Sequence, residues 1–155
     1  LPLSVTRVLD LGCGIGLWRD VTARHFPHAS YQGVEISDYL CEQYGWQKGS
    51  VVDYRSRGRF DLVICQGVLP YLDARAAKQA IDNLGSLCRG ALYLEAITKD
   101  DWESGIIDKR RTDGSMQLRS ARWYRRALGE HFDSLGGGVW LAKRAQPALY
   151  ALERG

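Results

Sequence analysis

A short apolar run that ends in a glycine-rich turn constrains this chain more than any other feature of its sequence. Residues 7–11 (RVLDL) are typical of a buried strand, and a G-x-G-x-G turn follows directly at residues 12–16. A helix is then predicted from Leu17 to Phe26, because its pattern is helical and Pro27 ends it. A strand, a tight turn and a helix open a parallel crossover unit. The turn therefore predicts an α/β fold with a ligand site where the first strand ends.

Short apolar runs and helical patterns continue to alternate along the chain, which is typical of a doubly wound, mostly parallel sheet with helices on both faces. Further strands are predicted at residues 31–35, 50–54, 60–65 and 91–96, and helices at 37–44, 73–88 and 121–132. Two closing strands, 139–144 and 148–153, surround Gln146-Pro147. Residues 98–120 are rich in charge and glycine, so they are expected to form a lid or substrate loop. No linker or repeat divides residues 1–155, which indicates a single domain.

Composition and charge exclude several classes of protein. The chain has 155 residues, 45% of them hydrophobic, and no apolar run approaches the roughly 20 residues of a membrane helix, so no membrane partner is expected. Residues 1–100 hold 11 Lys/Arg and 11 Asp/Glu, whereas residues 101–155 hold 10 and 7. A globally basic nucleic-acid binder is therefore not indicated. The four cysteines show no zinc spacing and are interpreted as reduced core residues of a cytoplasmic protein.

Acidic residues are predicted to follow three strands, where open α/β sheets bind their ligands. Asp10 stands beside the glycines, Glu35 comes 19 residues after Gly16, and Asp53 ends the predicted third strand. The dinucleotide pattern G-x-G-x-x-G is absent because Leu17 takes its last position, which disfavours a nicotinamide oxidoreductase. An acid at the turn disfavours a phosphate but suits a ligand that carries an amine and a sulfonium. The acids at 35 and 53 are placed to accept from ribose hydroxyls and an adenine amino group.

These segments resemble the class I S-adenosylmethionine-dependent methyltransferases of the small-molecule kind. The resemblance covers residues 7–97 and is carried by 8–16, 33–37, 51–54 and 60–69. It implies a Rossmann-like, seven-stranded sheet whose last two strands form an antiparallel hairpin. It also implies S-adenosylmethionine as cofactor, S-adenosylhomocysteine as product and no metal. Family members usually carry cap helices before the first strand, which this chain is expected to lack. The expected cofactor-binding residues are Asp10, Gly12, Cys13, Gly14, Gly16, Trp18, Glu35, Ile36, Asp53, Tyr54, Gln66 and Gly67.

The predicted function is methyl transfer to O or N of a small-molecule acceptor by in-line displacement, which requires positioning more than a base. Glu95, at the carboxyl end of the fifth strand, and Tyr71, in the loop after the fourth, are the candidate catalytic residues. Cys65 at the end of a strand is interpreted as a core residue, not a nucleophile. Two alternatives stay open: a cofactor-binding module without transfer activity, and an RNA methyltransferase that uses the basic stretch 109–126. The three histidines are interpreted as helix caps, and a monomer or homodimer is expected.

Overall fold

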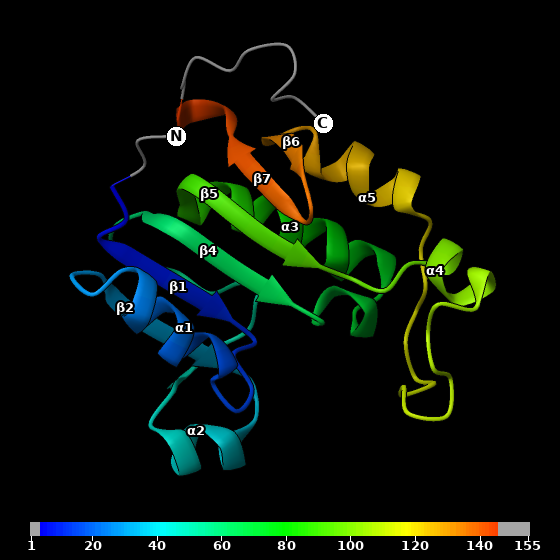
Figure 1. Cartoon of the computed structure of the whole chain (residues 1–155), viewed down its shortest axis with the longest axis horizontal. Helices are drawn as coiled ribbons and strands as arrows, with labels where there is room; N and C mark the ends of the chain where they lie inside the picture. The colour runs from blue at the N-terminus through cyan, green and yellow to red at the C-terminus, as the bar shows by residue number, and fades with distance from the viewer. Residues whose placement is uncertain (1–3, 146–155) are drawn as a thin grey trace.

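The computed structural model describes residues 4–145, and within this range seven strands form one sheet (Figure 1). The strands follow the order β3-β2-β1-β4-β5-β7-β6, and β7 alone runs against its neighbours β5 and β6. The predicted α/β sheet with a C-terminal antiparallel pair is therefore confirmed. The strands are β1 (Arg7–Leu11), β2 (Ser30–Glu35), β3 (Gln47–Lys48), β4 (Phe60–Gln66), β5 (Cys88–Glu95), β6 (Phe132–Gly136) and β7 (Val139–Ala142).

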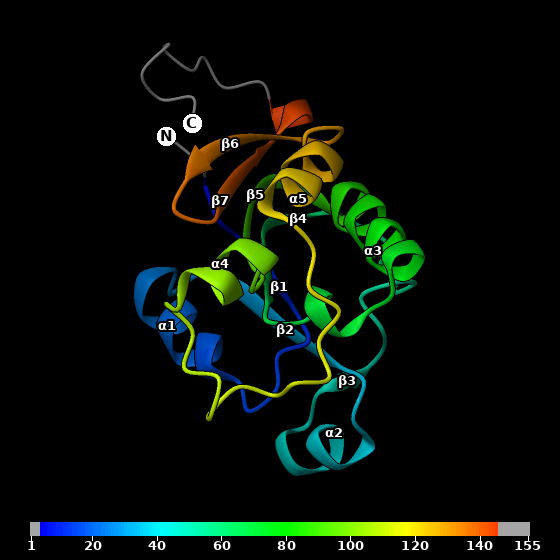
Figure 2. The ribbon, with the colours of Figure 1, turned by 90° about the vertical axis from the view of Figure 1, so that its right-hand side faces the viewer.

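Helices cover both faces of the sheet, as Figure 2 shows: α1 lies on one face, and α3 and α5 lie on the other. The helix α4 and the chain after it lie beyond the ends of β4 and β5 (Figure 1). No helix in residues 4–145 is long and apolar enough to cross a lipid bilayer. The α-helices are α1 (Leu17–His25), α2 (Asp38–Tyr44), α3 (Ala74–Leu87), α4 (Lys99–Ser104) and α5 (Ala121–Leu128), and the 3-10 helices are η1 (Leu69–Tyr71) and η2 (Lys143–Ala145).

Local side chains determine where the helices begin. The side chains of Ser37, Asp73, Thr98 and Ser120 each accept a hydrogen bond from the N–H three residues further on. Such caps satisfy amide groups that the first turn of a helix leaves without partners. Gly45 ends α2 in the left-handed conformation. The helices predicted at 37–44 and 73–88 are thus confirmed to within one residue at each end.

The core lies around the central strands β1 and β4, which are buried between the two helical layers. Val8, Leu9 and Leu11 have no exposed surface, and Ile81 and Leu84 of α3 pack in the same core. The order in which strands are added reverses at β1: β2 and β3 lie on one side of it, and β4 and β5 lie on the other, with β1 and β4 parallel. Loops that leave two such strands in opposite directions open a crevice at their carboxyl ends.

One predicted strand and the end of one predicted helix are wrong, and another predicted strand lies outside the described residues. Residues 51–53 form a turn in which the Ser50 carbonyl accepts from the N–H groups of Asp53 and Tyr54, so the third strand is the polar edge pair Gln47–Lys48 instead. The helix predicted at 121–132 ends at Leu128, and residues 132–136 form β6. The hairpin is therefore β6–β7, because Gly136, Gly137 and Gly138 supply the positive φ angles of its turn. The strand predicted at 148–153 lies outside the described range.

Candidate functional site

The glycine-rich turn crosses the carboxyl end of β2 and is held there by its backbone. The N–H groups of Gly12 and Cys13 donate to the Val34 carbonyl at 2.8 and 3.2 Å. Gly12, Gly14 and Gly16 have φ angles of +78°, +53° and +83°, a region in which a side chain is strained. A Cβ on Gly12 would lie 2.3 Å from Val68 Cγ2, so the turn also needs glycine for close packing.

The glycines of the turn differ in the space around them, and this difference can be measured. Gly12→Ala is expected to lower the free energy of unfolding by about 2–4 kcal/mol, because backbone strain adds to the overlap with Val68. Gly14→Ala serves as the matched control: it has a positive φ, but no atom lies within 4 Å of its added Cβ. Strain alone should cost about 1 kcal/mol there. Urea unfolding of both variants measures the difference, and equal losses would contradict this account of Gly12.

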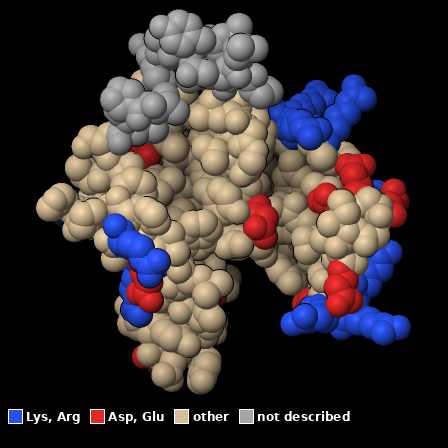
Figure 3. All heavy atoms as spheres, in the orientation of Figure 1, with Lys and Arg blue, Asp and Glu red and all other residues tan. Residues whose placement is uncertain are grey.

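Two neighbouring cavities open at the carboxyl ends of the strands, on either side of the turn. The larger has a volume of about 430 Å³ and the smaller about 290 Å³. Gly12 and Gln66 line both, so these two residues form the wall between them. Figure 3 shows a hollow between the part of the molecule that carries α1 and α2 and the part that carries α4. The larger cavity is lined by Gly12, Glu35, Ile36, Gly49, Ser50, Val51, Gln66, Gly67, Val68, Tyr71 and Leu72, and the smaller by Asp10, Gly12, Cys13, Gly14, Ile15, Leu17, Trp18 and Gln66.

Asp10 supplies a buried carboxylate to the smaller cavity. Its side chain comes from β1, is 1% exposed, and accepts a hydrogen bond from the Tyr31 hydroxyl at 2.6 Å through Oδ2. Burial raises the pKa of Asp10 to about 6; the charge of Glu35 also raises it, while the bond from Tyr31 opposes the shift. No hydrogen bond from the described residues reaches its other oxygen, Oδ1. A cationic group in this cavity would find a partner in that oxygen.

Glu35 ends β2 and holds the turn and the next helix together. Its Oε2 accepts from the Gly14 N–H at 2.9 Å, and its Oε1 accepts from the N–H groups of Ile36 and Ser37 at 2.9 and 3.1 Å. The residue is 7% exposed and lines the larger cavity. A carboxylate has about four acceptor positions, so this one keeps capacity for a further donor. The same contacts fix its orientation toward the cavity.

A chain of hydrogen bonds crosses the wall between the cavities. The Trp18 indole N–H donates to Gln66 Oε1 at 2.6 Å, and Gln66 Nε2 donates to Glu95 Oε2 at 3.0 Å. The Tyr93 hydroxyl also donates to Glu95 Oε2 at 3.3 Å, and the rings of Trp18 and Tyr93 lie 5.0 Å apart. These side chains come from α1, β4 and β5, so only the folded sheet brings them together. Glu95 lines neither cavity but is bonded to a residue that lines both.

Most of the residues predicted from the sequence meet at these cavities, but three cofactor candidates do not. Asp53 is exposed in the turn that replaces the predicted strand. Tyr54 is buried, and its hydroxyl bonds to Gln32 and Gln47. Gly16 packs under Trp46, whose Cζ2 would lie 2.5 Å from an added Cβ. These positions give no support to their predicted contacts with a cofactor. The predicted set omitted seven lining residues: Ile15, Leu17, Gly49, Ser50, Val51, Val68 and Leu72. Of these, Ile15, Val51 and Val68 lie in the segments that carry the family resemblance.

The basic stretch 109–126 does not form one surface. Lys109, Arg110 and Arg111 are exposed in the loop after α4, and Arg122, Arg125 and Arg126 are exposed on α5; Figure 3 shows separate groups of basic side chains on this side of the molecule. Arg119 lies between them but points inward. Its guanidinium donates to the carbonyls of Leu69 and Leu72, and the Gln117 N–H donates to that of Pro70. Arg119 therefore fixes the end of the loop to η1, which carries Tyr71 into the larger cavity.

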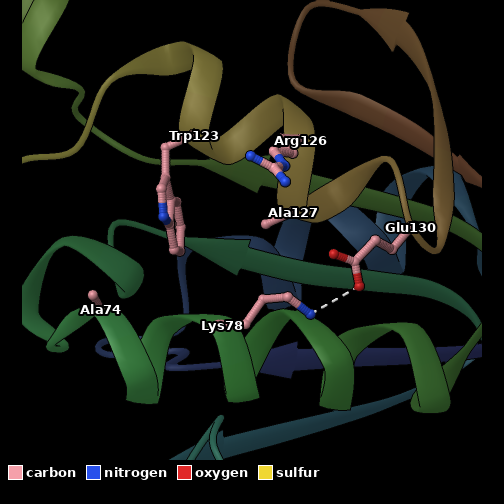
Figure 4. Close-up of a pocket in the computed structure, with 6 residues that line it drawn as sticks. All are labelled: Ala74, Lys78, Trp123, Arg126, Ala127 and Glu130. Carbon is pink, nitrogen blue, oxygen red and sulfur yellow. Dashed lines mark hydrogen bonds and ion pairs between the residues drawn. The ribbon is translucent and has the colours of Figure 1, made fainter.

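A third cavity, of about 360 Å³, lies away from the turn, between α3 and α5 (Figure 4). The ammonium of Lys78 bonds to Glu130 at 2.9 Å and to Asp82 at 2.6 Å. The His131 ring also bonds to Asp82, at 2.7 Å, so His131 joins the turn before β6 to α3 and does not cap a helix as predicted. Asp82, Glu130 and His131 together resemble a metal-binding group, but Lys78 already supplies the positive charge at this place.

The cysteines support no nucleophilic role. All four lie in the described range and none is disulfide-bonded, and only Cys41 is partly exposed. Cys65 is fully buried in the core, and burial raises its pKa to about 12. A thiol with such a pKa is almost entirely protonated at neutral pH, and the thiolate is the reactive form. The interpretation of Cys65 as a core residue is therefore confirmed.

Comparison with known proteins agrees with this arrangement. Trans-aconitate 2-methyltransferase of Pseudomonas aeruginosa is 28% identical over 99% of this chain and 50% of its own length. Ubiquinone biosynthesis O-methyltransferase of Xylella fastidiosa is 29% identical over 64% of this chain and 45% of its own length. The chain thus spans about half the length of these two relatives. The solved structure of an N-methyltransferase from Bradyrhizobium japonicum, in complex with S-adenosylhomocysteine, shares the fold with a TM-score of 0.65 and 16% identity, covering 90% of this chain and 79% of its own.

Residues 2–142 match the family described as a methyltransferase domain, which is more than nine-tenths of the chain. The order of the strands, the antiparallel pair at the end of the sheet and the glycine-rich turn after β1 all agree with that match. The chain belongs to the methyltransferase domain family, and its fold is the Rossmann-like fold of the class I S-adenosylmethionine-dependent methyltransferases.

Proposed function

We propose that this chain binds S-adenosylmethionine across the two cavities and transfers its methyl group to an O or N atom of a small molecule. The observation that carries this proposal is the pair of adjoining cavities, each with a buried carboxylate, that share Gly12 and Gln66. An elongated ligand with a cationic amine at one end and a ribose with an adenine at the other matches this layout. The donor chemistry also matches, because carboxylates pair with ammonium groups and accept from hydroxyls.

The two cavities would hold different parts of the cofactor. Asp10 would hold the amino group, since its Oδ1 has no partner among the described residues and its environment is buried. Glu35 would accept from the ribose hydroxyls while its backbone contacts hold it in place. Ser50 and Val51 line the far part of the larger cavity, where the adenine would lie. The cofactor supplies an activated methyl on sulfur, and the protein contributes orientation and exclusion of water.

The acceptor side is assigned to the segment beyond the strands. The helix α4 and the chain up to residue 120 lie past the carboxyl ends of β4 and β5 (Figure 1), and Arg119 fixes them to η1. Tyr71 of η1 lines the larger cavity and is half exposed, so it would contact the acceptor. The relatives include an enzyme named for trans-aconitate, one for ubiquinone biosynthesis and one for N-methylation, which supports a small acceptor. The absence of disulfides among the described residues fits a reducing compartment such as the cytoplasm.

Isothermal titration with S-adenosylhomocysteine, S-adenosylmethionine and NADH tests the proposal. Micromolar binding of the first two, about −8 kcal/mol, with none for NADH is the expected result. The acid beside the turn disfavours the pyrophosphate of NADH, whereas it attracts the amino group of the other two ligands. Binding of NADH alone, or of none of the three, would overturn the proposed function.

A further inference from the structure

We propose that Glu95 faces the transferring methyl group and selects acceptors whose reacting atom carries a proton. Such acceptors are amines and hydroxyls, which Glu95 favours over carboxylates. The inference rests on the proposed function and deepens it by naming the acceptor class. Glu95 lines neither of the two cavities, so their linings alone do not identify it. Its place follows instead from the covalent structure of the cofactor and from the hydrogen bonds around Gln66.

The position of the reacting centre follows from the layout of the two cavities. In S-adenosylmethionine the sulfur stands between the ribose and the amino-acid portion. The ribose belongs beside Glu35 in the larger cavity, and the amino group belongs beside Asp10 in the smaller one. A ligand that joins these two ends passes Gly12 and Gln66, which among residues 4–145 are the only two that line both cavities. The sulfur and its methyl therefore come next to the side chain of Gln66.

Trp18 decides which way the Gln66 amide points. An indole N–H can only donate, so the Gln66 atom that faces Trp18 at 2.6 Å must be the carbonyl oxygen. The amide NH₂ then faces Glu95 Oε2 at 3.0 Å and needs an acceptor there. Trp18 thus acts through Gln66 as a positioning residue for the Glu95 carboxylate. The Tyr93 hydroxyl donates to the same Oε2 at 3.3 Å and holds it from the other side.

These contacts leave one carboxylate oxygen available. Gln66 and Tyr93 both donate to Oε2, and no described residue donates to Oε1. Glu95 is exposed at the end of β5. The N–H of a neutral amine or the O–H of a hydroxyl group would donate to this oxygen, whereas a carboxylate acceptor would be repelled by it. Glu95 therefore favours acceptors that bring a proton to the site.

The transfer balances with this assignment. The lone pair of the acceptor N or O forms the new bond to the methyl carbon, and the carbon–sulfur bond breaks with its electron pair on sulfur. The acceptor atom gains a positive charge in this step and then loses its proton to Glu95 Oε1. A carboxylate acceptor would have no proton to release and would need no base. The fixed carboxylate is therefore useful for amine and hydroxyl acceptors only.

Sinefungin tests the assignment without knowledge of the acceptor. In this analogue a carbon that carries an amino group replaces the sulfonium, so a cation stands where the transferring methyl would be. Wild-type protein is expected to bind sinefungin at least tenfold more tightly than S-adenosylhomocysteine, as measured by isothermal titration. In Glu95→Gln the two affinities should become equal within about threefold, with little change for S-adenosylhomocysteine. Trp18→Phe should lower the ratio as well, because Gln66 is then free to turn.

Glu42→Gln is the matched control, since Glu42 is an exposed glutamate on α2, and it should keep the wild-type ratio. If wild-type protein binds S-adenosylhomocysteine but Glu95→Gln leaves the sinefungin ratio unchanged, the assignment of Glu95 is wrong while the proposed function stands. If wild-type protein binds neither ligand, the proposed function fails and this inference fails with it.

Discussion

Asp10→Asn is expected to stabilise the unliganded protein by up to about 3 kcal/mol at pH 8 while weakening cofactor binding about 10- to 100-fold. The buried carboxylate has a pKa of about 6 against an ordinary value near 3.8, so at pH 8 it carries a charge that its surroundings disfavour. Asn keeps an oxygen that accepts from Tyr31 but carries no charge. The same change removes the charge-assisted bond to the cofactor amino group, which is worth about 1.5–3 kcal/mol.

The sign of the pH dependence provides a second check on Asp10. Because folding raises its pKa, its favourable contribution to stability is complete below about pH 3.8 and is lost as the pH rises through 6. Wild type and Asp10→Asn should therefore be similar in stability at pH 4 and differ most at pH 8, as measured by urea unfolding. Asp20→Asn, at an exposed position of α1, should show no such difference. Equal stabilities of wild type and Asp10→Asn at pH 8 would contradict the assigned environment of Asp10.

Asp61→Asn is expected to lower the free energy of unfolding by about 3 kcal/mol at pH 7. Asp61 Oδ2 accepts from the Thr6 N–H and hydroxyl and from the Arg7 N–H, and Oδ1 accepts from Arg89 Nε at 2.7 Å. The side chain thus joins the starts of β1 and β4 to β5. Asn has one acceptor oxygen and an NH₂ group in place of the second carboxylate oxygen. This NH₂ group would face either the donors of Thr6 and Arg7 or the donor of Arg89. Hydrogen bonds to a charged group such as this buried carboxylate contribute about 1.5–3 kcal/mol each.

The pH dependence of Asp61 has the opposite sign. Burial alone would raise its pKa, but the hydrogen bonds from Arg89, Thr6 and Arg7 outweigh burial and lower the pKa below its ordinary value. Its contribution is therefore present above about pH 3.8 and is lost as the pH falls below that value. Urea unfolding between pH 2.5 and 7 should show this loss in wild type and a smaller one in Asp61→Asn. Asp133→Asn, on the exposed side of β6, is the control. A wild-type pH dependence retained in Asp61→Asn would show that another acid is responsible.

The two aspartates show how tertiary surroundings give one residue type opposite roles. Asp61 accepts from donors of two segments, Thr6 and Arg7 at the start of β1 and Arg89 of β5, so its charge stabilises the fold. Asp10 has a single hydroxyl donor and a neighbouring carboxylate, so its charge is costly until a cation binds. A buried charge without a matching partner in the free protein is typical of a binding site. This asymmetry supports the proposal that the smaller cavity receives a cationic group.

Local chemistry by itself determined the class of the fold and half of the candidate site. The strand and glycine turn at 7–16 and the acid at Glu35 depend on backbone geometry and burial that a short segment specifies, and the structure confirms them as elements. The helices that begin after the caps Ser37 and Asp73 were predicted for the same reason. Each of these features needs only a few neighbouring residues, so periodicity and turn chemistry are enough to find them.

Only the tertiary structure decided the rest. The strand β3 is two polar residues that pair with β2 at the sheet edge, so no apolar pattern marks it, while Val51 and Tyr54 are apolar because their turn packs into the core. The hairpin β6–β7 was missed because the helical pattern of 121–128 continues to residue 132 in the sequence. In the structure the helix ends at Leu128 and a strand begins at Phe132. The contacts of Glu95 with Gln66 and Tyr93, and of Gln66 with Trp18, join three elements that are distant in sequence. Contacts between side chains of different strands leave no local sequence pattern, because the order of the strands determines which side chains are neighbours. That order is established only when the whole core packs.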